Sequence, residues 1–482
     1  MKLKLYFLCI FIYSVTSINA QQYIEQQNKE QKLLDMLAAG KYFEAKDYYT
    51  NLKANGDSLN QIIDCYYKYQ RASYINKPQC AAIYLDKLLT VYKPFGLLSF
   101  EYYFRLWKLY AETLQDYEKA LYTCNKIRSY IEENPNKAND NSLQEWMKYV
   151  SDWETQTRRR MVEPVIKVVH NNSKNTEDII NDSTGLLSFN AIYNGRNIIK
   201  TVFDTGVTDF FILDKTTAEL IGVRKYHIYD NDTVITLNGV KAQGYIGILD
   251  SIQIANVKLF NIPTFIWERK SLVNLSDSAS LDPSKKEVLN NFYESFQVIM
   301  GLKTMNLIGK VKLDWINNIL CFPTPELYTC LSREPNIFML KDKLFTQIKI
   351  NNLPLTAFID TGANKYIDID SQYYERHKED IPINQSIEKD TLNIAMLHDI
   401  RQNIPYKIAD KPSVSFNDSP IYTGDANKVQ IHSLLDWNRL NANPDDNVYL
   451  DITDGVVGYN FFKHLGHKIM FDFRNMRIDI IE

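Results

Sequence analysis

The chain has 482 residues, 45% of them hydrophobic, and a formal net charge of −3 at pH 7. This length exceeds what one hydrophobic core supports, so we expect about three domains. The charge excludes the strongly basic balance typical of nucleic-acid-binding proteins, and no nucleic-acid partner is predicted. The six cysteines show no zinc-ligand spacing, so neither a metal nor another cofactor is predicted.

The amino terminus has the pattern of a secretory signal peptide. Lys2 and Lys4 precede an apolar run from Leu5 to Val15, and small residues continue to Ala20. We therefore predict a signal peptide over residues 1–20 and an exported protein, periplasmic or extracellular. Nothing later approaches the ~20 consecutive apolar residues of a spanning helix, so no stable membrane anchor is predicted. The alternative for this segment is a buried amino-terminal helix.

Residues 21–165 are poor in glycine and carry apolar residues at three-to-four spacing, which predicts an all-α region. Within it, segments 40–45 and 115–120 each place an aromatic residue three positions before an alanine. These segments resemble the second helix of tetratricopeptide repeats, and the resemblance implies a concave surface for a protein partner. The alternative is a stack of helical hairpins that only packs against the next domain.

Residues 166–184 are polar and aperiodic, which is typical of a linker or an extended arm. From Gly185 onward, short apolar runs are separated by turn pairs such as Asn194-Gly195 and Asn351-Asn352. This alternation predicts a series of hairpins in an all-β region.

The β region repeats itself once. Apolar residues lead into Asp204-Thr205-Gly206, and apolar residues again lead into Asp360-Thr361-Gly362. At nearly equal distances downstream, an apolar-apolar-Gly segment ends at Gly301 in the first copy and at Gly458 in the second. The duplication predicts two homologous lobes. Their predicted bounds are residues 185–325 and 335–482.

With these paired motifs the region resembles the aspartic peptidases of the pepsin and retropepsin group. The resemblance implies a multidomain chain in which the helical-repeat-like region precedes an all-β bilobal acid-protease fold. It implies Asp204 and Asp360 as the catalytic pair, supported by the hydroxyls of Thr205 and Thr361 and the backbone N–H groups of Gly206 and Gly362. Gly301 and Gly458 would lie in the psi-shaped crossing of each lobe.

Two carboxylates so close together cannot both ionise cheaply, so the pair is expected to share one proton. One member then activates water and the other donates to the carbonyl of a polypeptide substrate, without a metal. Because both lobes lie in one chain, a monomer is predicted. Val207 and Ala363 stand where pepsin-like enzymes usually carry Ser or Thr. We therefore hypothesise a weakly acidic to neutral pH optimum.

A hairpin that closes over substrate is expected between the first aspartate and Gly301, and its predicted turn is Asn238-Gly239. The rival interpretation from another class is a catalytically inactive peptide- or protein-binding protein that keeps the peptidase shape. For Cys321 and Cys330, both a disulfide and two unlinked thiols agree with the sequence.

Overall fold

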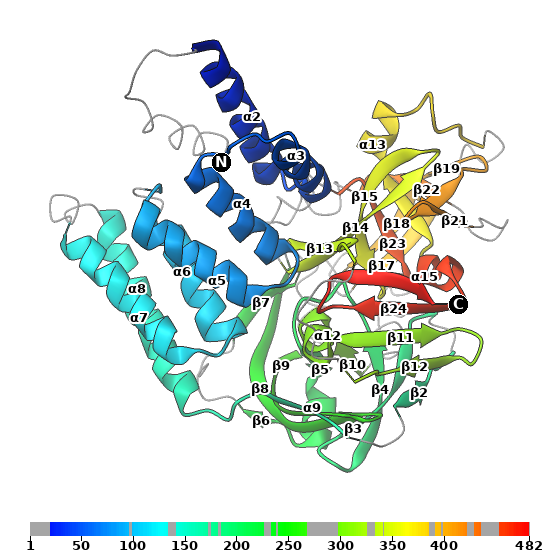
Figure 1. Cartoon of the computed structure of the whole chain (residues 1–482). Helices are drawn as coiled ribbons and strands as arrows, with labels where there is room; N and C mark the ends of the chain where they lie inside the picture. Colours follow the sequence, from blue (N-terminus) through cyan, green and yellow to red (C-terminus); the bar gives the residue numbers. More distant parts are fainter. Residues whose placement is uncertain are drawn as a thin grey trace. The chain divides into compact units, whose positions relative to one another are not determined.

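The computed structural model divides into two compact units, Met1–Val165 and Ile166–Glu482, and each is described by itself (Figure 1). The predicted signal peptide, residues 1–20, lies outside the described residues except for Ala20. The structure describes residues 20–95, 99–133, 141–171, 175–181, 185–225, 233–237, 240–267, 297–324, 333–340, 342–384, 391–396, 399–421, 429–434 and 453–481.

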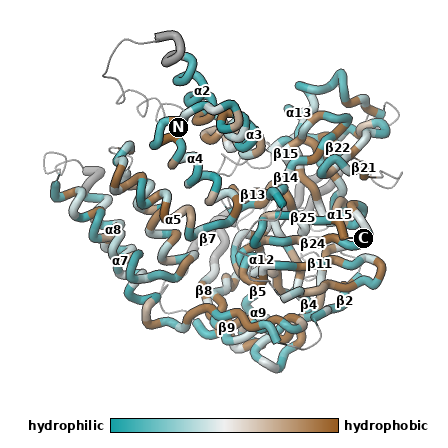
Figure 2. The backbone as a smooth tube through the Cα atoms, viewed as in Figure 1, coloured by the Kyte–Doolittle hydropathy of each residue, from teal (hydrophilic) through white to brown (hydrophobic). Residues whose placement is uncertain are grey.

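The first unit is α-helical. Its helices are α2 (Ala20–Ala38), α3 (Tyr42–Ala54), α4 (Gln61–Tyr74), α5 (Pro78–Lys87), α6 (Ser99–Lys108), α7 (Tyr117–Glu132) and α8 (Asn141–Met161), with π-helical turns η1 (Leu88–Tyr92) and η3 (Leu109–Thr113). Capping fixes two of the starts: Asn60 accepts from the Ile62 N–H, and Asp116 accepts from the Lys119 N–H. Hydrophobic and hydrophilic residues alternate along these helices (Figure 2), as amphipathic packing requires.

Aromatic rings fill the contact between α6 and α8. Trp153 stacks on Phe100, Phe104 and Trp107 with centroid distances of 5.2, 4.9 and 5.3 Å, and the Trp107 indole N–H donates to Thr157. Among the described residues, no helix combines the length and apolar character needed to cross a membrane.

The tetratricopeptide resemblance rests on two alanines, and both are fully buried. Ala45 lies in the first turn of α3 and Ala120 in the first turn of α7. Small buried side chains allow close approach of neighbouring helices, which explains their presence without requiring a repeat. A tetratricopeptide-like repeat, and a protein partner on this unit, stay predictions.

The second unit is β-rich and consists of two similar halves. In the first half the strand order is β1-β9-β5-β10-β4-β3-β8-β6, with β7 paired to β8. The bounds are β1 (Lys167–His170), β3 (Ser188–Tyr193), β4 (Asn197–Phe203), β5 (Phe211–Asp214), β6 (Arg224–Lys225), β7 (Thr233–Leu237), β8 (Val240–Ile254), β9 (Val257–Trp267) and β10 (Val298–Met300).

The second half follows the order β19-β22-β16-β23-β15-β14-β20-β21, with β13 paired to β14. The bounds are β13 (Ile337–Leu340), β14 (Lys343–Ile350), β15 (Leu353–Asp360), β16 (Ile367–Asp370), β19 (Lys407–Ile408), β20 (Val414–Phe416), β21 (Ser419–Ile421), β22 (Val429–His432) and β23 (Gly455–Gly458). A separate hairpin joins β17 (Thr391–Met396) and β18 (Asp399–Pro405). In both halves the strand that carries the aspartate lies between a hairpin partner and a parallel strand.

Strand pairing refines how the two halves correspond. Aligning the two aspartates by number matches Phe189 with Phe345. In the structure, Ser188 pairs with Val202 and Phe345 pairs with Phe358, in each case two residues before the aspartate. Phe345 therefore corresponds to Ser188. The cause is the first hairpin's turn, which is one residue longer than the second's.

Short helices interrupt the region that was predicted as all-β, so it is β-rich instead. They are α9 (Lys215–Ile221), α12 (Leu302–Ile308), α13 (Ser371–Arg376) and α15 (Tyr459–Leu465). In α12, Leu302, Met305 and Ile308 are fully buried at a spacing of three, which gives one apolar face on a single short helix.

A third sheet joins the two halves, in the order β2-β12-β11-β24-β25. Its strands are β2 (Thr176–Asp178), β11 (Lys310–Asp314), β12 (Ile319–Cys321), β24 (Lys468–Asp472) and β25 (Arg477–Ile481). The central pair β11 and β24 is antiparallel and carries two reciprocal ion pairs. These are Lys310 with Asp472 at 3.4 Å and Lys468 with Asp314 at 3.6 Å, and both carboxylates are buried.

The segment predicted as a linker, residues 166–184, contributes two strands. β1 pairs with β9, and β2 pairs with β12. A polar, aperiodic sequence can form edge strands because its backbone groups still pair with a neighbour, so this correction follows from hydrogen bonding. Cys321, in β12, is a buried free thiol, while Cys330 lies outside the described residues.

Candidate active site

The two predicted aspartates lie where strands end and turns begin. Asp360 is the last residue of β15, in which Leu355, Ala357 and Ile359 are buried and alternate with less buried positions. This alternation puts Asp360 on the less buried face of its strand. Asp204 follows β4, and its side chain is also half-buried.

Each carboxylate is held by the turn that follows it. The Gly206 N–H donates to Asp204 Oδ1 at 2.7 Å, and the Gly362 N–H donates to Asp360 Oδ1 at 3.0 Å. A hydrogen bond from a backbone N–H favours the charged form of a carboxylate. Both predicted glycines therefore contact the aspartate of their own loop.

The two threonines cross-link the loops through four hydrogen bonds. Thr205 Oγ1 donates to the carbonyl of Ile359 at 2.9 Å and accepts from the Thr361 N–H at 3.0 Å. Thr361 Oγ1 does the same with the carbonyl of Phe203 and the Thr205 N–H, at 2.9 and 3.0 Å. Both threonines are fully buried. All four bonds join the two halves of the unit, so the threonines fix one loop against the other.

The carboxylates share one small space. A Cβ atom added to Gly362 would lie 2.3 Å from Asp204 Cγ, and one added to Gly206 would lie 2.6 Å from Asp360 Oδ1. Glycine is therefore required at both positions, since any side chain would collide with the opposite aspartate. Each of these Cβ positions lies within about 3 Å of the carboxyl group of the opposite loop, so the two carboxyl groups are neighbours.

Burial raises the pKa of both carboxyl groups. Desolvation is the largest cause for each, and for Asp360 the charge of Asp204 adds to it and raises the pKa to about 8. The positive charge of Lys343 opposes both shifts. Such a coupled pair can share one proton, which makes one member a base and the other an acid.

The downstream glycines pack against the same loops. Gly301 follows β10, and an added Cβ there would lie 2.3 Å from the carbonyl oxygen of Asp209. Gly458 ends β23, and its added Cβ would lie 2.4 Å from the carbonyl oxygen of Ala363. The parallel strands β10 and β23 thus approach the aspartate loops too closely for any larger residue. The psi-shaped crossing that the family resemblance implies for Gly301 and Gly458 stays a prediction.

Strands β7 and β8 pair from Thr233 with Gly244 to Leu237 with Val240, at the place of the predicted closing hairpin, whose closing role stays a prediction. Its predicted turn, Asn238-Gly239, lies outside the described residues. In the second half, β17 and β18 form an antiparallel hairpin at the corresponding place in the chain.

Sequence reasoning missed Lys343, the first residue of β14. Its Nζ donates to the carbonyl oxygen of Gly206 at 2.7 Å, so a lysine of the second half reaches the aspartate loop of the first. Desolvation lowers the pKa of this amine, and the charges of Asp360 and Asp204 partly counter the shift. The available signal was a cation at the start of the strand that leads to the second aspartate, but strand position alone does not reveal a contact across two lobes.

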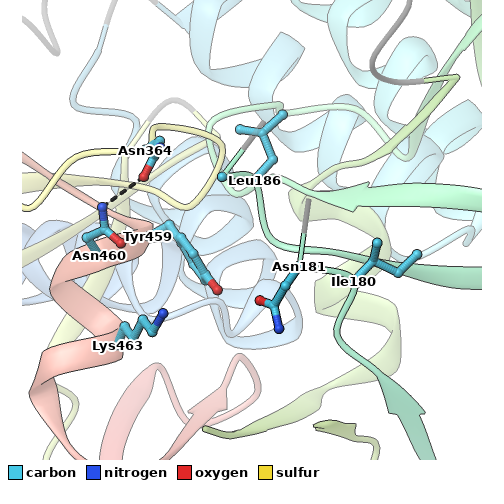
Figure 3. A pocket seen from close by; sticks show the side chains of 8 residues that line it. Ile180, Asn181, Leu186, Asn364, Tyr459, Asn460 and Lys463 are labelled. Carbon is cyan, nitrogen blue, oxygen red and sulfur yellow. Dashed lines mark hydrogen bonds between the residues drawn. The ribbon is translucent and has the colours of Figure 1, made fainter. Parts of the chain in front are cut away.

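A small cavity of about 190 Å³ lies beside the Asp360 loop (Figure 3). It is lined by Ile180, Asn181, Gly185, Leu186, Asn364, Tyr459, Asn460 and Lys463. The Asn460 amide donates to Asn364 at 2.8 Å across one side of it. Neither aspartate lines this cavity, and it is too small for a peptide, so it is separate from the carboxyl pair. Within the described ranges, no group of His, Cys, Asp and Glu has a metal-binding arrangement.

Comparison with solved structures finds similar chains. One of them is the crystal structure of a retropepsin-like aspartic protease from Rickettsia conorii, with 18% sequence identity and a TM-score of 0.20, over 32% of this chain and 91% of that chain. No family model matches the chain, and neither does any curated protein. At that TM-score the relationship is coarse and carries nothing about activity.

Proposed function

We propose that the protein is an aspartic endopeptidase with a bilobal acid-protease fold and that Asp204 and Asp360 form its catalytic pair. One observation carries the proposal: two Asp-Thr-Gly loops face each other and hold two carboxyl groups in one small space. If each Asp-Thr-Gly segment were only a turn at the end of a strand, there would be no reason for the two segments to lie against each other across the lobe boundary. The reciprocal threonine bonds would also be unnecessary in such a turn.

The carboxyl pair has the groups that peptide hydrolysis requires. The ionised carboxylate takes a proton from water as the water oxygen bonds to the scissile carbonyl carbon, and the protonated carboxyl gives its proton to the carbonyl oxygen. In the second step the carboxylate that lacks a proton takes one from a diol hydroxyl, and the other carboxyl group gives its proton to the amide nitrogen as the C–N bond breaks. The pair then again holds one proton, and no covalent intermediate forms.

The proposal includes the setting predicted from sequence. The substrate would be a polypeptide outside the cytoplasm, the active form a monomer, and the helical unit a site for a protein partner. The half-buried state of both carboxylates supports a site that substrate can reach.

The test is cleavage of a diverse peptide mixture from acidic to neutral pH by the purified chain without its predicted signal peptide. Asp204→Asn and Asp360→Asn should each reduce cleavage by roughly 10²–10⁴-fold or more, because each removes one half of the acid–base pair. Asp250→Asn is the matched control. Asp250 is an exposed strand residue paired with Arg224, so its loss should leave cleavage unchanged.

Two results would contradict the proposal. A wild-type chain that cleaves nothing at any pH, yet binds peptides, would support the inactive binding protein instead. Cleavage that survives both aspartate substitutions would place the activity elsewhere.

A further inference from the structure

The ammonium group of Lys343 lies in an unusual place. It is half-buried, donates to the Gly206 carbonyl, and sits 5.4 Å from the ring centroid of Phe358. The acidic groups that act on it are the two site aspartates together with Asp209 and Asp342. Asp209 also has its own lysine, since Lys303 Nζ lies 3.5 Å from it. Lys343 is therefore the cation that bears on both carboxyl groups of the pair.

The peptide group that Lys343 contacts also faces Asp204. The carbonyl of Gly206 and the N–H of Val207 belong to one peptide unit. Lys343 binds its oxygen, while the Val207 N–H lowers the pKa of Asp204 by hydrogen bonding. A cation on the carbonyl polarises the whole unit and strengthens the N–H as a donor. The charge of Lys343 thus acts on both carboxyl groups through space, while its bond to the Gly206 carbonyl acts on Asp204 through this peptide.

The Asp360 loop has no equivalent cation at the corresponding strand position. The pairing of β3 with β4 and of β14 with β15 makes Leu186 the counterpart of Lys343. Leu186 is apolar and lines the small cavity beside Asn364 (Figure 3). The Ala363 N–H, which corresponds to that of Val207, donates to the backbone oxygen of Asp360 at 3.1 Å. The two loops therefore differ in the acceptor of this N–H and in the charge beside it.

We propose that Lys343 is a positioning residue that makes the carboxyl pair asymmetric: it holds the negative charge on Asp204 and leaves the shared proton on Asp360. This inference rests on the proposed function for its meaning in catalysis. Asp204 is then the base that takes the proton from water, and Asp360 is the acid that protonates the substrate carbonyl. The hydrogen bond of Lys343 goes to the Gly206 carbonyl and to neither carboxyl group. Lys343 therefore acts through the Gly206–Val207 peptide and through its charge.

The experiment is a pH titration of the full chain labelled with ¹³C at the aspartate carboxyl carbon. Asp204→Asn and Asp360→Asn spectra assign the two signals. The variants are Lys343→Met, which removes the charge at similar volume, Lys343→Gln, which keeps a donor without the charge, and Lys343→Arg, which keeps the charge. Lys365→Met is the matched control, because Lys365 lies in the same half but donates to Gln430 at 3.0 Å.

In the wild type, the lower titration step should move mainly the Asp204 signal and the upper step mainly the Asp360 signal. Lys343→Met should raise the lower step by about one pH unit, the size expected for losing a nearby opposite charge, and should make the two signals respond more equally. Lys343→Arg should resemble the wild type, and Lys365→Met should too. If the enzyme is active, the acid limb of kcat/KM should shift by the same amount in Lys343→Met.

The inference is overturned if Lys343→Met and Lys343→Gln titrate like the wild type or if Lys365→Met shifts the pair equally. The titration needs no activity, so the two proposals can fail separately. A chain without peptidase activity whose pair still responds to Lys343 would refute only the function. An active peptidase whose pair ignores Lys343 would refute only the positioning role.

Discussion

The two halves of the β-rich unit are alike in the aspartate loops, where they touch, and differ in the side chains that lie next to those loops. The Asp204 and Asp360 loops share their glycine contacts, their threonine bonds and their parallel strands. Next to the Asp204 loop of the first half lies Lys343, which comes from the second half. At the corresponding position beside the Asp360 loop lies Leu186, which comes from the first half. The shared geometry of the pair thus constrains both copies, while the surrounding side chains are free to give each copy its own electrostatics.

A second difference lies in the cores. In the first half, β5 and β9 bring together apolar residues, with Ile212 opposite Phe265. The corresponding strands β16 and β22 place Asp368 opposite Gln430, and Asp368 Oδ2 lies 3.1 Å from the His432 ring in a fully buried contact. One half is therefore held by apolar packing at this level and the other by a buried polar contact.

The largest expected effect tests what the halves share. Gly362→Ala would place a methyl group 2.3 Å from Asp204 Cγ, and Gly206→Ala would place one 2.6 Å from Asp360 Oδ1. Both should reduce peptide cleavage by about 10²-fold or more, since a misplacement of roughly 1 Å has that cost. The measurement is kcat/KM on a peptide that the wild type cleaves.

The control for the glycines is Gly195→Asn. Gly195 has φ +72° and open space around its Cβ position, and asparagine tolerates this conformation. Full activity in that variant would show that the collision with the carboxylate matters. Equal activity in Gly362→Ala and the wild type would mean that the loops are not packed as described.

The next effect tests where the halves differ. Asp368→Ala removes the carboxylate beside the buried His432 ring and should lower the free energy of unfolding by about 1–3 kcal/mol. Asp250→Ala removes an exposed carboxylate that also contacts a cation and should cost about 0–1 kcal/mol. Urea unfolding monitored on the β-rich unit compares the two. If both variants unfold at the same urea concentration, the buried contact adds no stability.

The last effect concerns pH and builds up gradually. The pKa of Asp360 is raised to about 8, above an unfolded value of about 3.9, so the folded state binds an extra proton between these values. Stability contributed by this group is therefore present at low pH and lost as pH rises through that window, by up to about 1.4 kcal/mol per pH unit. Asp360→Asn should remove this loss. Urea unfolding at several pH values should show the variant gaining on the wild type towards pH 8, and parallel curves would contradict the raised pKa.

Much of the site could be predicted because the Asp-Thr-Gly motif and its downstream apolar-apolar-Gly segment each occur twice in the chain. The triplets at Asp204 and Asp360 and the glycines at 301 and 458 lie at matched separations, and a duplicated lobe must bring such segments to one boundary. The structure places these residues together as that reasoning requires.

What could not be predicted depends on register and on contacts across the lobes. One extra residue in the first hairpin's turn shifts the match, so Leu186, and not the residue that equal numbering selects, is the counterpart of Lys343. The polar segment 166–184 shows no periodicity, yet β1 and β2 form because sheet edges supply their hydrogen bonds. Pairing partners of this kind lie far away in the sequence, where local patterns carry no signal.

The sheet that joins the halves has a consequence for the order of folding. Strand β11 pairs with β24, whose residues Lys468–Asp472 are among the last of the described chain. Contacts between such distant segments form slowly, because a long loop must close before they contribute. A growing chain that already displays the Asp204 loop still lacks the partner strand that sets one lobe against the other. We therefore expect the carboxyl pair to assemble only after the chain has been synthesised through β24, so that shorter chains lack the pair.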